Sequence, residues 1–186
     1  METTGPGTDA PQQPVTPEPD LKDWTWVLER PCPECGSAAG DVAPTDLGAA
    51  VRATVPRWHS ALARPDARVR PTPTTWSPTE YGAHVRDVLR VFTGRLELML
   101  ERDAPTFPNW DQDATALAER YDLADPVVVA AEIAAAAEVA AAAFDAVRED
   151  QWDRTGLRSN GSHFTVASLG AYFLHDLRHH LHDVGA

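Results

Sequence analysis

The chain has 186 residues, of which 43% are hydrophobic and 24% charged, a composition typical of one globular domain with a buried core. Its 28 acidic and 16 basic side chains give a net charge of -12, which argues against nucleic acid or an anionic membrane surface as a partner. No run of apolar residues approaches the length of about 18 that a membrane span requires, so no span is predicted.

Residues 1–20 are rich in proline, threonine, glycine and acidic side chains. Such a segment buries too little apolar area to offset the entropy of ordering it, so we predict a disordered tail. The segment lacks the basic and apolar regions of a signal peptide, and we therefore expect a cytoplasmic protein. A single lysine, Lys22, beside abundant arginine and alanine indicates a GC-rich genome such as that of an actinobacterium.

Residues 21–42 are predicted to form an N-terminal extension that carries both cysteines of the chain. The apolar residues between positions 24 and 28 can pack this extension onto the main domain. Cys32 and Cys35 lie in "PCPECG" and look like one half of a zinc ribbon, but a closed zinc site needs four ligands. No histidine nearby in the sequence completes the set. Three interpretations stay open: a reduced structural turn, a zinc ion shared between subunits, and a redox pair or labile disulfide.

Four helical segments follow the extension. The first spans about residues 45–63, where apolar side chains recur at steps of three and four, and Pro56 inside it should kink or split the helix. The second begins at "SPTE", where Ser77 is the N-cap, Pro78 occupies the first helical position and Glu80 completes a capping box.

The third segment begins at Asp125 and is rich in alanine, which favours helix and close packing. The fourth begins near Thr165. No segment shows the alternation of a strand, so we predict an all-α protein in which residues 43–186 form a four-helix bundle. The long connection over residues 103–124 should contain a short helix or a functional loop.

That connection contains the sequence "NWDQD". Trp110, Asp111 and Asp113 can form a lid over a site, or the two acids can simply cap a helix.

The last helix carries four histidines. At about 100° per residue, His175, His179 and His182 share one face, whereas His180 points elsewhere. An apolar stripe lies roughly opposite that face, at Val166, Phe173, Leu177 and Val184. The shared face is either exposed to water or lines a pocket.

His84 in the second helix lies among Tyr81, Val88 and Val91, so it is expected to be buried or partly buried. If the second and fourth helices are neighbours, His84 can meet His175 and His179, and three neutral imidazoles can hold a divalent cation with open coordination positions.

Three acidic residues lie near these imidazoles in the predicted helices. Asp87, Asp176 and Asp183 can orient the histidines as hydrogen-bond acceptors, or they can form a solvated helix face.

The pattern "WSPTEYGAH", which ends at His84, followed ninety residues later by "HDLRHH", which begins at His175, resembles the DinB-like superfamily over about residues 43–186. That superfamily comprises metal-binding four-helix bundles, among them bacillithiol- and mycothiol-dependent S-transferases and maleylpyruvate isomerase. The resemblance implies His84, His175 and His179 as metal ligands and leaves His182 as a pocket or surface residue. It does not extend to the "CPEC" segment. Zinc is the first candidate for the metal, with nickel and iron as alternatives.

The resemblance also implies an activity. We expect a metal-dependent S-transferase or isomerase that uses a thiol, mycothiol, as co-substrate and acts on a small electrophilic molecule. A metal-dependent hydrolase and a non-catalytic, stress-related metal- or ligand-binding bundle are the alternatives. The expected partners are a small-molecule substrate and a second copy of the chain in a homodimer, with neither nucleic acid nor membrane.

Overall fold

The computed structural model describes residue 17 and residues 23–186. The predicted tail, residues 1–20, therefore lies outside the described residues except for Pro17.

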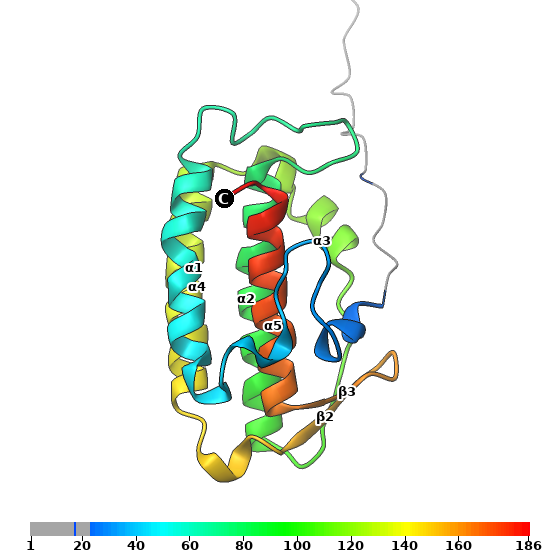
Figure 1. The fold of residues 1–186 in the computed structure, drawn as a ribbon. Helices are drawn as coiled ribbons and strands as arrows, with labels where there is room; N and C mark the ends of the chain where they lie inside the picture. Colours follow the sequence, from blue (N-terminus) through cyan, green and yellow to red (C-terminus); the bar gives the residue numbers. More distant parts are fainter. Residues whose placement is uncertain (1–16, 18–22) are drawn as a thin grey trace, which may run out of the picture.

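Four long helices form the body of the protein, which confirms the predicted four-helix bundle (Figure 1). They are α1 (Leu47–Leu62), α2 (Pro78–Glu101), α4 (Pro126–Asp145) and α5 (Val166–Asp183). Helices α1 and α2 each pack mainly against α4 and α5 and touch each other only slightly, so the order around the bundle is α1, α4, α2, α5. Helices α2 and α5 are therefore neighbours, which is the arrangement that a shared site requires.

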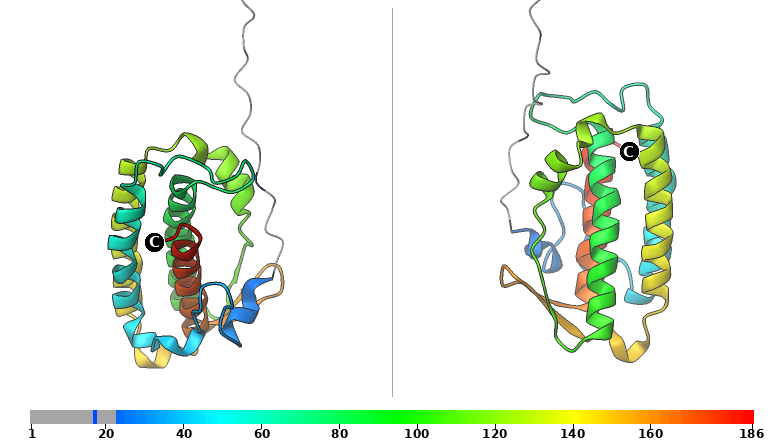
Figure 2. Two further views of the ribbon diagram at one scale, coloured as in Figure 1. Left: turned by 45° about the horizontal axis from the view of Figure 1, so that its top comes forward. Right: turned by 180° about the vertical axis from the view of Figure 1, so that it is seen from behind.

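Helices α2 and α4 run in the same direction, so the chain between them must return along the whole bundle (Figures 1 and 2). The returning segment contains β1 (Thr106–Phe107), α3 (Gln112–Ala118) and the 3₁₀ helix η4 (Tyr121–Leu123). The short helix expected in this connection is thus present.

The predicted starts of α2 and α4 are confirmed by their N-terminal caps. The Glu80 backbone N–H donates to Ser77 Oγ at 3.3 Å, and the Glu80 carboxylate accepts from the Ser77 N–H at 2.8 Å, which completes the capping box. Asp125 caps α4 by accepting from the Val127 N–H at 2.8 Å. The split expected at Pro56 does not occur, because α1 is continuous through that residue.

The structure also contains a small three-stranded sheet that the sequence did not predict. Strand β2 (Thr155–Arg158) pairs in parallel with β1 and antiparallel with β3 (His163–Thr165). Strands of two to four residues are too short to show a period of two, which explains why no alternation was visible. A 3₁₀ turn, η5 (Glu149–Gln151), leads from α4 into the sheet.

The core lies between the four helices. Phe173 of α5 stacks on Phe92 and Phe144, with ring centroids 5.3 Å and 5.7 Å apart. The predicted stripe of α5 is buried, with Val166, Phe173 and Leu177 all completely inaccessible to solvent. The side of α5 that faces the bundle is therefore fixed by this stripe.

Among the described helices, α4 alone is long and apolar enough to cross a membrane, by length and composition only. No such helix was predicted from the sequence. In the bundle it packs along α1 and α2. Its Glu132 pairs with Arg86 of α2 at 3.0 Å, and its Glu138 pairs with Arg52 of α1 at 2.8 Å. These ion pairs place both glutamates at seams of the bundle.

The N-terminal extension packs on α5. Its 3₁₀ helices are η1 (Trp24–Leu28) and η2 (Ala39–Asp41), and it runs alongside the last helix, after which η3 (Pro44–Asp46) leads into α1 (Figure 1). Val27 and Cys32 are buried, with 2% and 1% of their surface exposed. The extension therefore covers a face of α5 that a plain four-helix bundle would leave to solvent.

Candidate metal centres

Helix α5 contains two interleaved pairs of candidate ligands at a spacing of four residues. His175 and His179 form the first pair, and Asp176 and His180 form the second. Residues four apart lie on one face of a helix, and the one-residue offset turns the two pairs about 100° apart. Each pair joins a different group of metal-ligating side chains.

The first group consists of Cys32, Cys35, His175 and His179, whose ligand atoms all lie within 4.8 Å of one another. A tight turn places the two cysteines. The Gly36 N–H donates to the Cys32 carbonyl and the Cys32 N–H to the Ser37 carbonyl, both at 2.9 Å. Gly36 has a φ of +75°, a conformation that glycine adopts without steric cost.

The contacts within this group point the ligand atoms inward. Cys32 Sγ lies 3.7 Å from His179 Nδ1, and the other nitrogen of His179 faces Glu34 at 3.5 Å and Asp183 at 3.7 Å. His175 Nε2 is buried without a hydrogen-bond partner. The Trp24 ring packs edge-on against His179, with centroids 4.9 Å apart.

Both histidines of the first group are held in the neutral form. Burial, together with the nearby His179, lowers the pKa of His175 to about 4. Burial also lowers the pKa of His179, although Asp183 acts in the opposite direction. Neutral imidazole is the form that binds metals.

The second group consists of His84 on α2 with Asp176 and His180 on α5. Asp176 Oδ1 lies 3.8 Å from His84 Nε2 and 3.4 Å from His180 Nε2. Neither ring nitrogen of His84 has a hydrogen-bond partner, nor does Asp176 Oδ1, although all three atoms are buried. Unpaired buried polar atoms are costly, so their convergence fits a site that binds a cation.

Burial lowers the pKa of His84, and the neighbouring Asp176 only partly offsets this effect. For Asp176, burial raises the pKa, but the contacts with the nearby histidines outweigh it and leave the pKa below its usual range. The second group therefore offers a neutral imidazole beside a carboxylate, both in the form that coordinates metal.

Aromatic rings surround His84. Trp110 stacks on it with a centroid distance of 5.4 Å and an angle of 4°, and Trp76 lies 5.5 Å away. Asp111 caps α3 by accepting from the Ala114 N–H at 2.9 Å, and Asp113 lies in the first turn of that helix. The connection thus places Trp110 over the site, while Asp111 serves as a helix cap.

The three predicted accompanying acids differ in their roles. Asp183 bonds to His180 Nδ1 at 2.8 Å and so orients an imidazole, as expected. Asp176 is itself a candidate ligand. Asp87 instead accepts from Tyr121 Oη at 2.6 Å and pairs with Arg86.

The structure divides the predicted triad between the two groups. His84 lies with Asp176 and His180, whereas His175 and His179 lie with the cysteines. The ligation of one metal by His84, His175 and His179 stays a prediction, and the described residues instead group His84 with Asp176 and His180.

His180 points to a different side of α5 from His175 and His179, as predicted, and its ring lies 4.8 Å from that of His84. The i, i+4 spacing of Asp176 and His180 was a signal for this pair in the sequence. His182 is exposed and belongs to neither group.

The rotation of α5 explains this division. At about 100° per residue, Asp176 and His180 lie roughly 40–80° from the buried stripe, at the seam with α2. His175 and His179 lie roughly opposite the stripe, where the N-terminal extension covers them. They thus face away from the bundle core and are nevertheless buried.

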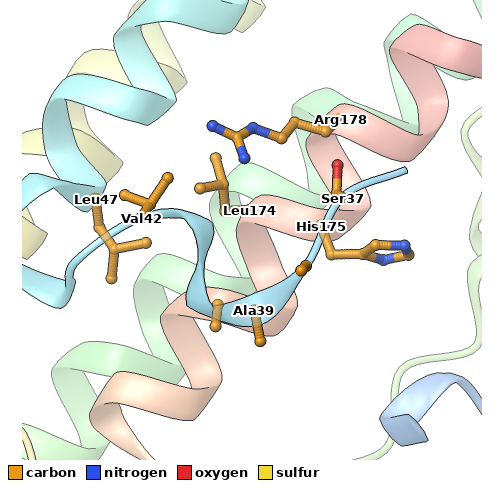
Figure 3. Close-up of a pocket in the computed structure, with 9 residues that line it drawn as sticks. Ser37, Ala39, Val42, Leu47, Leu174, His175 and Arg178 are labelled. Atoms are coloured by element: carbon orange, nitrogen blue, oxygen red, sulfur yellow. The ribbon is translucent and has the colours of Figure 1, made fainter. Parts of the chain in front are cut away.

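A small pocket lies between the N-terminal extension, the start of α1 and helix α5 (Figure 3). Leu47, Val42, Leu174 and Arg178 are among its lining residues, and the His175 ring points away from Leu47 and Val42. Of the seven residues in the two groups, only His175 lines this pocket, so the pocket adjoins the first group and is separate from the second.

The bundle and its ligand groups define a class of protein, the helical bundles with histidine-rich candidate metal centres between their helices. Within that class, the chain belongs to the DinB superfamily, whose family model matches residues 50–184.

The structure also resembles that of YfiT from Bacillus subtilis, with a TM-score of 0.67 and 16% sequence identity over 77% of this chain and 86% of that one. YfiT is described as "a probable metal-dependent hydrolase with an unusual four-helix bundle topology". At this identity the likeness establishes the fold. A comparison with the curated proteins finds no match.

Proposed function

We propose that this chain is a divalent-metal-dependent enzyme whose ion is held by His84, Asp176 and His180. The observation that carries the proposal is the convergence of their buried polar atoms, of which the His84 nitrogens and Asp176 Oδ1 have no hydrogen-bond partner. Three nitrogen and oxygen ligands leave coordination positions for a substrate, as catalytic centres require. Zinc is the first candidate, and nickel and iron suit the same ligands.

Solvent access supports a catalytic role for this group. The side chains of Asp176 and His180 are 22% and 18% exposed, whereas that of His84 is 1% exposed. The more exposed side of the group thus lies on α5, and we propose that a small molecule approaches the buried ligand atoms from there. The bond from Asp183 fixes the His180 ring, and Trp110 covers one face of the His84 ring.

We propose a low-molecular-weight thiol, mycothiol, as the co-substrate. A bound divalent cation lowers the pKa of a coordinating thiol and so supplies thiolate at neutral pH. The sulfur forms a bond to an electrophilic carbon of a small molecule, the leaving group departs with the bonding electrons, and the thiol proton passes to solvent. The family resemblance supports a thiol, and together with the actinobacterial composition it supports mycothiol as that thiol.

The nearby carboxylates also favour a thiol over water as the nucleophile. Asp87 is engaged by Arg86 and Tyr121, and Asp183 is engaged by His180. A thiol needs no further base once a cation stabilises its anion, whereas activation of water usually gains from a free carboxylate. Hydrolysis is the second candidate, because two histidines and one carboxylate also serve zinc hydrolases.

The test compares product formation from a small aryl halide, with and without mycothiol, by the zinc-loaded wild-type chain and two variants. We expect thiol-dependent product from the wild type and from His182→Ala, and none above background from His84→Ala. His182 is a matched control because it is an exposed histidine outside both groups. Turnover of an ester with water alone would establish the hydrolase instead. Equal rates for the wild type and His84→Ala would refute a centre at His84.

A further inference from the structure

We propose that Cys32, Cys35, His175 and His179 form a second, structural zinc site that fastens the N-terminal extension to the last helix. This site is separate from the open centre at His84 and does not depend on it. Two thiolates and two imidazoles are a complete ligand set for tetrahedral zinc.

The spacing of the ligand atoms fits one ion. Zinc–sulfur and zinc–nitrogen bonds of about 2.3 Å and 2.0–2.1 Å at a tetrahedral angle place sulfur and nitrogen about 3.6 Å apart. Cys32 Sγ and His179 Nδ1 are separated by 3.7 Å, and all four ligand atoms lie within 4.8 Å of one another. Only small side-chain adjustments are therefore needed to reach tetrahedral coordination.

Three of the four ligands in this group are buried, and Cys35 is partly exposed. Cys32, His175 and His179 are 1%, 8% and 7% exposed. With four protein ligands around one ion, it matches a structural site and leaves no position for a substrate. The buried His175 Nε2 has no hydrogen-bond partner, and coordination would satisfy it.

The surroundings hold the ligands in place before any ion binds. The backbone hydrogen bonds of the Cys32–Gly36 turn hold the two cysteines close together, on the side of the group opposite α5. Glu34 and Asp183 face the outer nitrogen of His179, as carboxylates do beside zinc-bound histidines. The net charge of two thiolates and a divalent ion is zero, so burial of the loaded site carries little electrostatic cost.

A disulfide between the cysteines explains less of the structure. Both cysteines are free thiols here, and a Cys32–Cys35 bond would leave the two buried histidines without a role. A redox pair usually lies at the N-terminus of a helix, whereas Cys32 and Cys35 lie in a turn outside the described helices and Cys32 is buried. Zinc uses all four residues together.

The first experiment measures zinc per chain in the full-length protein and the reactivity of its thiols toward a thiol reagent before and after chelation. We expect both thiols to be protected until the chelator removes the ion. Replacement of His179 by alanine should lower the zinc content by one ion per chain and expose the thiols. The matched control, His182→Ala on the same helix, should leave both readouts unchanged. Thiols that react equally fast with and without zinc would overturn the proposal.

A second measurement keeps the proposal testable if a variant folds poorly. Cobalt(II) bound to thiolate gives a charge-transfer absorption that imidazole and carboxylate ligands do not produce. We expect this band in the wild type and in His84→Ala, and its loss in Cys35→Ser. The His84 variant separates the two sites, because failure of the open centre would leave the band intact. A wild-type protein that binds cobalt without the band would show that the cysteines are not ligands.

Discussion

The carboxylate of Asp87 joins α2 to the segment that returns along the bundle. It accepts from Tyr121 Oη at 2.6 Å, pairs with Arg86 at 2.8 Å and contacts Arg90 at 3.2 Å. Its side chain is only 13% exposed. This one residue therefore positions the end of the connection that carries Trp110 across the open centre.

Replacing Asp87 with asparagine should lower the free energy of unfolding by about 1–3 kcal/mol, because a buried charged hydrogen-bond network loses its anion. Burial raises the pKa of Asp87, but Arg86 and Tyr121 outweigh burial and bring the pKa below its usual value. The stabilisation is thus complete above the unfolded carboxyl pKa and is lost as pH falls through the folded pKa. Urea unfolding at neutral and acidic pH measures both effects, and the variant should differ least from the wild type at the acidic end. An equal difference at both pH values would contradict this role.

The adjacent residues His175 and Asp176 should affect different ions. We expect His175→Ala to lose the ion bound by the cysteines and to keep the ion at His84. We expect Asp176→Asn to lose the ion at His84 and to keep the ion bound by the cysteines. Each variant should lose one ion per chain while its helical circular dichroism stays near that of the wild type, since the buried stripe of α5 remains. Elemental analysis combined with thiol titration distinguishes the two. Loss of both ions in either variant would show that the groups are not independent.

At the scale of the elements, close contacts between helices depend on small residues. A Cβ on Gly170 of α5 would lie 2.4 Å from a methyl carbon of Leu47 and 2.9 Å from the Phe144 ring. A Cβ on Gly94 of α2 would meet nothing within 4 Å. Both glycines lie inside helices, but Gly170 is tightly packed against neighbouring side chains and Gly94 faces open space.

Alanine at these two positions should therefore have opposite effects. Gly94→Ala should raise the free energy of unfolding by about 0.5–1 kcal/mol, because alanine is the better helix former. Gly170→Ala should lower it by about 1–3 kcal/mol, because the added methyl group overpacks the core between α5, α1 and α4. Thermal unfolding of both variants checks the pair. A stabilising effect at Gly170 would show that Leu47 repacks without strain.

The helices could be predicted from the sequence because their signals are local. The cap at Ser77 and the apolar stripe of α5 both lie within a few turns of chain. The strands could not be predicted, since β1 pairs with a segment some fifty residues away and is only two residues long.

The candidate site was predictable only in part, for a similar reason. The residue types were visible, but the grouping depends on how α5 is rotated against α2. It also depends on Cys32, which meets His179 across 147 residues of chain. In the sequence, the incomplete ligand set at the two cysteines was the signal that pointed to histidines far along the chain.

At the scale of the whole molecule, the structural zinc would make stability depend on metal. An ion at about 1,000 times its dissociation constant adds about 4 kcal/mol to the free energy of unfolding. Chelation should therefore lower the melting temperature of the wild type and open the extension to proteases near Gly36. The Cys35→Ser variant should show the same protease sensitivity with and without chelator. A wild-type extension that resists cleavage after chelation would indicate that packing by Val27 and Trp24 is sufficient to hold it.

The contact between the extension and α5 also sets an order of events during synthesis. Cys32 precedes His179 by 147 residues in the chain. At roughly 5–20 residues per second, the cysteines are made roughly 7–30 s before their histidine partners. The extension and α5 can therefore join only after His179 has been made, and the nascent thiols remain uncovered until then.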